Sequence, residues 1–208
     1  MIEISRESIE AIRNEYREIC DMLTPNVIIK RLKAPEGSLC LWEFTVNAPT
    51  YYITGAGDVN PKRTDSIIFY LDIRNGYPRT KPSVYYDRNK ILASVNTFTS
   101  GSQCTDEWHF DEQNSGKNST LESIVRKTVM DIIHDPSVTR FDSMANHYLY
   151  SWQKRMFESG ALPSCSIGHV LKLDVSASSG NAHMDSPKRF SASGRCNPPA
   201  LPPQRRWG

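Results

Sequence analysis

Cys104 is the residue whose type and surroundings most clearly suggest chemistry. Residues 99–107 place this one thiol among serine, threonine, glycine, glutamine and acidic residues, and the next large apolar side chain is Trp108. Buried cysteines usually have apolar neighbours, so the composition predicts a surface loop. A thiol in such a loop can act as a nucleophile through its thiolate. The surroundings alone favour an unreactive surface thiol, and a reactive cysteine needs further support from the sequence.

Histidine would be the partner of this thiol in two kinds of site. A cysteine hydrolase would pair Cys104 with His109, His134 or His147, and this alternative stays open although the third, orienting group cannot be assigned. A zinc site would use Cys104 and His109, but no second Cys or His pair stands at ligand spacing. We therefore expect no metal and no other cofactor.

A helix near the start of the chain is the first element expected to support the thiol. Ser5 is a suitable N-cap, and Pro25 ends the helix. Apolar residues recur at helical spacing and form one face: Ile9, Ile12, Tyr16, Ile19 and Leu23. Such a face needs a sheet to pack against.

Four β-rich segments supply that sheet. They are residues 27–33, 39–46, 66–73 and 83–86, and we interpret them as an antiparallel meander. Residues 47–64 are rich in glycine, proline and charge and are expected to be a connection. After Tyr86 the regular pattern stops for about thirty residues, which is long for a structureless loop inside a compact domain. Cys104 lies in the middle of this loop.

Helices are expected again from Ser119. An apolar face continues to Ile133 and stops before Asp135, and Asp142 is predicted to cap a further helix. From residue 160 onward the periodicity is lost, and six of the thirteen prolines fall there among many serines. We therefore expect an α+β domain over residues 1–159 and a disordered basic tail over residues 160–208. Ala-His-Met at 182–184 is typical of a cloning site, so part of the tail is interpreted as engineered.

Several spacings resemble those of the ubiquitin-conjugating (UBC-like) family. The pair Tyr77-Pro78, a second proline four residues later and Val84 look like the family's strand-to-loop signature. The family has an asparagine eight residues before its cysteine, a glycine three before and commonly an aspartate two after. The matching residues here are Asn96, Gly101 and Asp106. The resemblance implies an N-terminal helix, a four-stranded antiparallel meander, an active-site loop and C-terminal helices.

The resemblance also implies a mechanism. Cys104 would hold an acyl group as a thioester, received from an activating enzyme, and pass it to an amine of an acceptor protein. Asn96 would stabilise the oxyanion or brace the loop. An acidic residue would position the amine and accept its proton, and the candidates are Asp106, Asp135 and Asp142.

Partners follow from the same resemblance. The donor would be a protein with a glycine-type C-terminus, either ubiquitin-like or the tail of a nucleotidyltransferase, and Gly208 is itself such an end. The family has histidine and proline where Ser94 and Val95 stand here, so the chain looks like a divergent member. It is similar to bacterial conjugating-enzyme-like proteins of antiphage (CBASS-type) operons. The activating enzyme would meet the first helix at Arg6, Arg13 and Arg17.

A second interpretation involves no catalysis. RWD domains share the strand-to-loop signature, bind partner proteins and lack the active-site thiol, so Cys104 is the residue that discriminates the two. Cys20 and Cys40 fall in helix and strand patterns and are interpreted as packing residues.

Charge and composition limit the partners and the cellular compartment that we expect for this protein. After residue 159 there are six Lys or Arg and two acidic residues, whereas the first 159 residues have 19 basic and 21 acidic residues. The six charges are scattered, so nucleic-acid binding is not expected. No leader or membrane-length apolar run is present, and five widely spread cysteines indicate a cytoplasmic protein without structural disulfides. A homodimer stays open.

Overall fold

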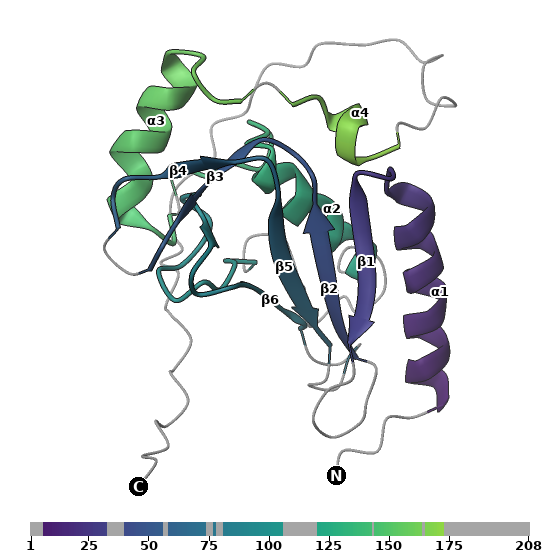
Figure 1. Ribbon diagram of the computed structural model, residues 1–208. Helices are drawn as coiled ribbons and strands as arrows, with labels where there is room; N and C mark the ends of the chain where they lie inside the picture. Colours follow the sequence, from purple (N-terminus) through teal and green to yellow (C-terminus); the bar gives the residue numbers. More distant parts are fainter. Residues whose placement is uncertain are drawn as a thin grey trace, which may run out of the picture.

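A four-stranded antiparallel sheet forms the centre of the fold (Figure 1). The computed structural model describes residues 6–32, 40–55, 58–73, 77, 81–105, 120–142, 144–163 and 165–172. The strand order is β1-β2-β5-β6, with β1 (Val27–Leu32), β2 (Leu41–Val46), β5 (Ile67–Asp72) and β6 (Ser83–Tyr86). These four strands agree with the predicted β-rich segments to within two residues at each end.

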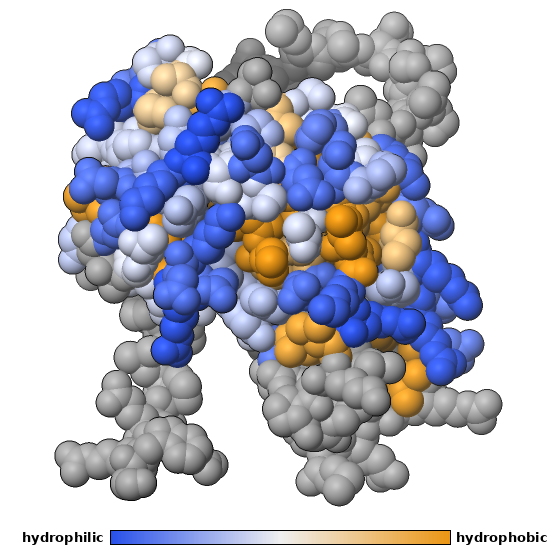
Figure 2. Space-filling view, in the orientation of Figure 1, coloured by the Kyte–Doolittle hydropathy of each residue, from blue (hydrophilic) through white to orange (hydrophobic). Residues whose placement is uncertain are grey.

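Alternation along the strands separates a buried face from an open one. Phe44 of β2 and Phe69 of β5 lie opposite each other in the register, and both are completely buried. Their rings stack with centroids 4.6 Å apart. Figure 2 shows the face of the sheet turned away from helix α2, where apolar side chains gather in the middle among hydrophilic ones.

A second, smaller sheet departs from the prediction. It has the order β4-β3-β7, with β3 (Thr50–Ile53), β4 (Lys62–Thr64) and β7 (Ile91–Leu92). Strands β3 and β4 fall in residues 47–64, which were expected to be a connection, so the meander is interrupted between β2 and β5. Both strands are short, and the Lys-Arg-Thr sequence of β4 has no alternating apolar pattern that would mark it.

Helix α1 (Arg6–Met22) lies along the edge of the sheet formed by β1 (Figure 1). Its predicted apolar face is confirmed toward the C-terminal end, where Ile19 is completely buried and the Tyr16 ring packs edge-on against Trp42 at 5.1 Å. Ile9 is 40% exposed, so its predicted inward position is wrong, because the core is reached only by the later turns. The predicted N-cap, Ser5, lies outside the described residues.

Glu15 joins α1 to two distant parts of the chain. Its carboxylate accepts a hydrogen bond from the Tyr77 hydroxyl and another from the backbone N–H of Leu121. Leu121 is the first residue of helix α2 (Leu121–Ile132). The tyrosine of the predicted strand-to-loop signature is thereby held against both helices.

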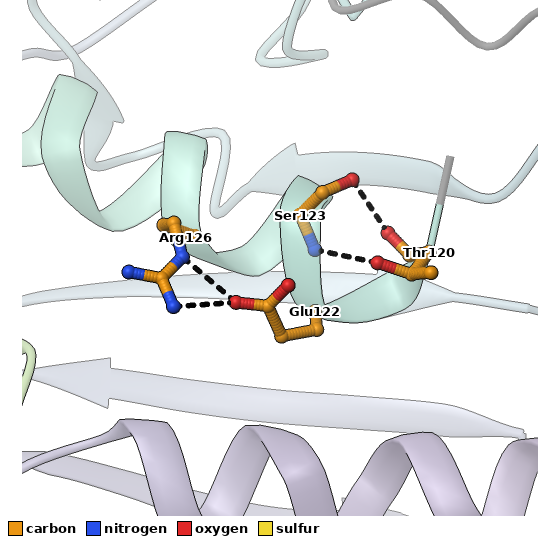
Figure 3. A network of polar contacts seen from close by, with 4 residues as sticks. All are labelled: Thr120, Glu122, Ser123 and Arg126. Carbon is orange, nitrogen blue, oxygen red and sulfur yellow. Dashed lines mark hydrogen bonds and ion pairs between the residues drawn. The ribbon is translucent and has the colours of Figure 1, made fainter. Parts of the chain in front are cut away.

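Both ends of α2 are capped. The Thr120 hydroxyl accepts a hydrogen bond from the Ser123 N–H at 3.1 Å, and the Glu122 carboxylate pairs with Arg126 one turn later at 2.7 Å (Figure 3). Thr120 is the N-cap, so the helix begins at Leu121, two residues after the expected start at Ser119. At the other end His134 has φ 55, its N–H donates to the Asp131 carbonyl, and the next N–H reaches back to Met130. This is a Schellman motif built on a histidine.

The described chain ends in a 3₁₀ turn and two helices, η2 (His147–Leu149), α3 (Tyr150–Glu158) and α4 (Ile167–Val170). Asn146, not Asp142, caps the first of them, because its side-chain oxygen accepts the Tyr148 N–H. Val170 and Leu171 are buried, and Leu171 forms a bridge with Leu23. The folded structure therefore continues past the expected boundary at residue 159. Residues 173–208 lie outside the described residues.

Candidate active site around Cys104

The loop that contains Cys104 is tied to both sheets. We call residues 93–105 the thiol loop. At its start the Ala93 N–H donates to the Tyr51 carbonyl of β3, and near its end the Gln103 N–H donates to the Val84 carbonyl of β6. The predicted irregular loop is thus a fixed element over this part of its length.

Gly101 makes the reversal of the thiol loop possible. Its φ is +90, and its carbonyl accepts the Tyr86 N–H at 2.8 Å. A Cβ added at this position would lie 3.2 Å from the Tyr86 carbonyl oxygen. The glycine three residues before the cysteine therefore has a local structural reason, because the φ favours glycine and the β6 backbone approaches closely.

Cys104 and Asn96 lie side by side. The Cys104 N–H donates to the Asn96 carbonyl oxygen at 2.7 Å, so the eight-residue spacing corresponds to a contact. Cys104 is 8% exposed, and the prediction of an exposed surface loop is wrong in this respect. The reason is that the polar side chains of the thiol loop are themselves buried, paired with one another and with α2.

Asp131 of α2 is the centre of that pairing. Its Oδ1 accepts hydrogen bonds from the Ser94 hydroxyl at 2.8 Å and from the Asn96 side-chain amide at 2.9 Å. Its Oδ2 accepts one from the Gln103 side-chain amide at 2.8 Å. The Gln103 oxygen in turn accepts the Tyr86 hydroxyl at 3.0 Å. Three residues of the thiol loop therefore donate hydrogen bonds to one carboxyl group.

Burial dominates the electrostatics of this region. Asp131 is completely buried, and burial raises its pKa to about 6, against the opposing effect of its three hydrogen bonds. Burial and the Asp131 charge raise the pKa of Tyr86 well above its ordinary value. Burial lowers the pKa of His134 to about 4; its Nε2 lies 3.3 Å from the Thr50 hydroxyl.

Asn96 uses both of its amide hydrogens inside the protein. One goes to Asp131 and the other to the Val138 carbonyl at 3.0 Å. Val138 belongs to the turn that begins with Asp135, so the structure brings this turn against the thiol loop. The arrangement braces the loop, which is one of the two roles that were predicted for Asn96.

The three candidate acids are placed differently. The Asp135 carboxylate accepts hydrogen bonds from the N–H and the hydroxyl of Ser137 within that turn. Asp142 is exposed and pairs with Arg140 at 3.3 Å. Asp106 lies outside the described residues.

The predicted partner residues are spread over the chain. Arg13 and Arg17 are exposed on α1, and the Arg17 guanidinium lies 3.4 Å from the Asn14 side-chain oxygen. Arg6 begins α1, but its side chain lies outside the described residues, as does Gly208. Of the histidines weighed as a hydrolase partner, His147 is exposed in η2, and His109 lies outside the described residues.

The two cysteines interpreted as packing residues differ from each other. Cys40 is buried, which confirms the interpretation for this residue, whereas Cys20 is exposed, so it is wrong there. Across the described ranges, no three His, Cys, Asp or Glu side chains gather as a metal site. Within the same ranges, no helix is both long and apolar enough to cross a bilayer.

Asp131 and Gln103 are the site residues that sequence reasoning missed. One signal was present, because Asp131 interrupts an apolar helical stretch between Val129 and Ile132. An acidic residue on the inward side of a helix needs buried donors, and the polar loop before Cys104 supplies them.

Comparisons with known proteins find a likeness of fold. No protein-family model matches the chain, and no curated protein matches it. Among solved structures the chain is similar to human ubiquitin-conjugating enzyme E2 G1, with 17% identity and a TM-score of 0.42, over 63% of this chain and 97% of that one. A likeness of this degree concerns only the arrangement of the chain. The function has to be argued from the site.

Proposed function

We propose that this chain is an acyl carrier of the ubiquitin-conjugating type, with Cys104 as its nucleophile. In the first step the thiolate sulfur attacks the activated carboxyl carbon of a donor protein, and the activating enzyme's leaving group departs. In the second step an amine nitrogen of an acceptor protein attacks the same carbon. The carbon–sulfur bond breaks, the sulfur leaves as thiolate, and the amine proton passes to a base.

The contact between Cys104 and Asn96 is the observation that supports this proposal best. The spacing that resembles the family coincides with a backbone hydrogen bond of 2.7 Å, in a loop held by buried side chains. A buried hydrogen-bonded network fixes one geometry, and burying it has a cost in free energy. A nucleophile benefits from such a fixed backbone, whereas a partner-binding surface does not require it.

Asn96 acts in this proposal as the brace of the thiol loop. Its amide holds the Asp135 turn through Val138 and the α2 helix through Asp131. The second predicted role, donation to the oxyanion, requires the amide to leave one of these acceptors. We therefore propose that Asn96 holds the thiol loop in place before the thioester forms. Stabilisation of the oxyanion by Asn96 is a prediction for the protein that carries the thioester.

The remaining roles follow the same hypothesis. Asp135, in the turn that Asn96 holds, is our candidate for the base that accepts the amine proton, and Asp106 and Asp142 are the alternatives. The activating enzyme would bind α1 around Arg13 and Arg17, and the donor would present a glycine-type C-terminus. We place this reaction in the cytoplasm.

A non-catalytic interaction module is the second candidate. Two observations favour it: Cys104 is only 8% exposed, and both amide hydrogens of Asn96 are engaged. In this case the fold would present its surfaces to a partner protein, and the thiol would be a packed side chain.

Transfer from a synthetic thioester separates the two candidates without knowledge of the natural partners. The full chain is incubated with a peptide thioester ending in glycine, and the products are resolved on a non-reducing gel and by mass spectrometry. We expect a thiol-sensitive adduct on Cys104. The same assay with an activating enzyme, ATP and a candidate donor protein then tests the complete reaction, in which Cys104→Lys should give a thiol-resistant adduct.

Cys20 provides the matched control, because it is an exposed thiol on α1. Cys104→Ala should abolish the adduct, and Cys20→Ala should leave it unchanged. An adduct that survives in Cys104→Ala, or that maps to Cys20, contradicts the assignment of the nucleophile. A chain that never accepts the acyl group at Cys104 is the interaction module.

A further inference from the structure

Asp131 connects the two residues that flank Cys104 in space and in sequence. The Asn96 backbone carbonyl accepts a hydrogen bond from the Cys104 N–H, and the Asn96 side-chain amide donates one to Asp131 Oδ1. Gln103 precedes Cys104 in the chain and donates its side-chain amide to Asp131 Oδ2. Displacement of this carboxyl group would therefore be transmitted to Cys104 from two sides.

We propose that Asp131 is a positioning residue for Cys104, and that its ionised carboxylate holds the thiol loop closed while its protonated form releases Gln103. The inference rests on the proposed function for its catalytic meaning. Its structural basis, the set of hydrogen bonds between α2 and the thiol loop, is independent of that function.

The bond from the Gln103 side-chain amide to Asp131 Oδ2 needs this oxygen to be unprotonated, because an amide N–H can only donate. A carboxylate is an acceptor on both oxygens, and here both oxygens face donors. A proton on Oδ2 would confront the N–H of Gln103, so that amide would have to turn. Its oxygen would then leave the hydroxyls of Tyr86 and Thr97, which it now accepts at 3.0 Å and 3.2 Å.

The other titratable groups around Asp131 keep one charge state near neutral pH. Tyr86 faces it from β6 and stays neutral, because its pKa is raised. His134 lies at the end of α2, faces Thr50, and stays neutral above its pKa of about 4. From the thiol loop, Ser94, Asn96 and Gln103 supply uncharged donors. Asp131, with a pKa of about 6, is therefore the group in this cluster whose charge changes just below neutral pH.

Alkylation of Cys104 by iodoacetamide tests the proposal on the full chain. The rate is read by mass spectrometry on the peptide that contains Cys104 and is divided by the rate for N-acetylcysteine in the same buffer. A thiol of ordinary pKa, about 8.5, changes its thiolate population by the same factor per pH unit throughout the range below neutral pH, so a loop that stays fixed is expected to give a constant ratio. We expect the ratio to rise about threefold or more as pH falls through about 6, because a released loop exposes the thiol.

Three variants distinguish positioning from other causes. Asp131→Asn should give a high ratio that does not vary with pH, and Asp65→Asn, an exposed carboxylate, should behave as the wild type. Gln103→Ala separates positioning from a direct effect of charge. The pH step should disappear in Gln103→Ala if the carboxylate acts through this side chain, and it should persist if the charge acts through space.

Each result has a defined consequence. A constant ratio in the wild type overturns the inference even if Asp131→Asn fails to fold, and so does a pH step that persists in Asp131→Asn or in Gln103→Ala. In the peptide-thioester assay Asp131→Asn should accept the acyl group on the order of tenfold more slowly than Asp65→Asn at neutral pH. A pH step without any thioester formation removes the carrier function and leaves Asp131 as the residue that fixes the loop.

Discussion

Asp131 and His134 lie close together at the end of α2, and burial shifts the pKa of each toward the neutral form of the residue. The folded-state pKa of Asp131 is raised, so its contribution to stability is present at low pH and is lost as pH rises from about 4 to about 6. The folded-state pKa of His134 is lowered, so its contribution is lost as pH falls from about 6.5 to about 4. The two dependences oppose each other over the same window.

Replacing either Asp131 or His134 should reveal the pH dependence of stability that the other residue causes. In Asp131→Asn the free energy of unfolding should rise relative to the wild type by about 2 kcal/mol between pH 4 and pH 6. In His134→Asn, which keeps a residue tolerant of positive φ, it should fall by a similar amount over that range. Urea denaturation across the pH series measures both. Parallel curves for wild type and variants would contradict the shifts.

At the residue scale the sequence drew attention to three residues of the thiol loop that lie close together in the chain. Asn96, Gly101 and Cys104 lie within nine residues of one another, and the loop that joins them brings Asn96 against Cys104. Asp131 could not be assigned to this site, because 26 residues, which include the first residues of α2, lie between it and Cys104. Long-range partners of polar loops depend on tertiary packing, which local patterns do not contain.

At the scale of elements, Glu15 is the connection between α1, α2 and the Tyr77 corner. The helical pattern of α1 predicted its inward face but not the contacts of the Glu15 carboxylate. By that pattern Glu15 is only one of the polar residues of the helix. The main strands were predicted well because their alternation is strong, whereas β3 and β4 were missed because theirs is absent.

Removing the Glu15 carboxylate should loosen this connection. In Glu15→Ala the Tyr77 hydroxyl and the Leu121 N–H lose their acceptor, which we expect to lower the free energy of unfolding by about 2 kcal/mol. Glu18→Ala, an exposed position on the same helix, should change it by less than about 0.5 kcal/mol. Chemical denaturation of the two variants is the measurement. Equal effects would mean that the Glu15 contacts contribute nothing.

Gly101 gives a second test at this scale. Gly101→Ala meets both an unfavourable φ of +90 and the Tyr86 carbonyl oxygen at 3.2 Å, whereas Gly160→Ala meets a φ of +65 in open space. We expect Gly160→Ala to cost about 1 kcal/mol and Gly101→Ala about 1–3 kcal/mol more, with slower acyl transfer in the second variant only. Thermal denaturation and the peptide-thioester assay compare them. A Gly101→Ala protein as stable as Gly160→Ala would show that the loop can shift.

At the scale of the whole molecule, the segment after residue 159 completes the core. Its compositional bias predicted a disordered tail, but composition averaged over the tail hid the short apolar stretch that ends with Val170 and Leu171. Hydrogen bonds from Thr24 and Asn26 to the His169 carbonyl, at 2.6 Å and 2.9 Å, attach this segment beside β1.

Truncation measures how much this segment contributes. A chain that ends at residue 172 should keep the stability of the full chain, whereas a chain that ends at residue 159 should lose about 3 kcal/mol or more, because two fully buried apolar side chains are removed. Leu171→Ala in the full chain should account for about 2 kcal/mol or more of that loss. Equal melting temperatures for the two truncated chains would restore the boundary at residue 159.

The thiol loop is bonded to Tyr51 at one end and to Val84 at the other, and these residues belong to sheets that have no strand in common. Because the thiol loop is hydrogen-bonded to both sheets, we expect the two sheets to unfold as one cooperative unit. While Asp131 is ionised and holds the loop, the amide proton of Cys104 should then exchange with deuterium only when the domain opens as a whole. A protein that binds the outer surface of either sheet would therefore alter the position of the Cys104 sulfur without contacting it.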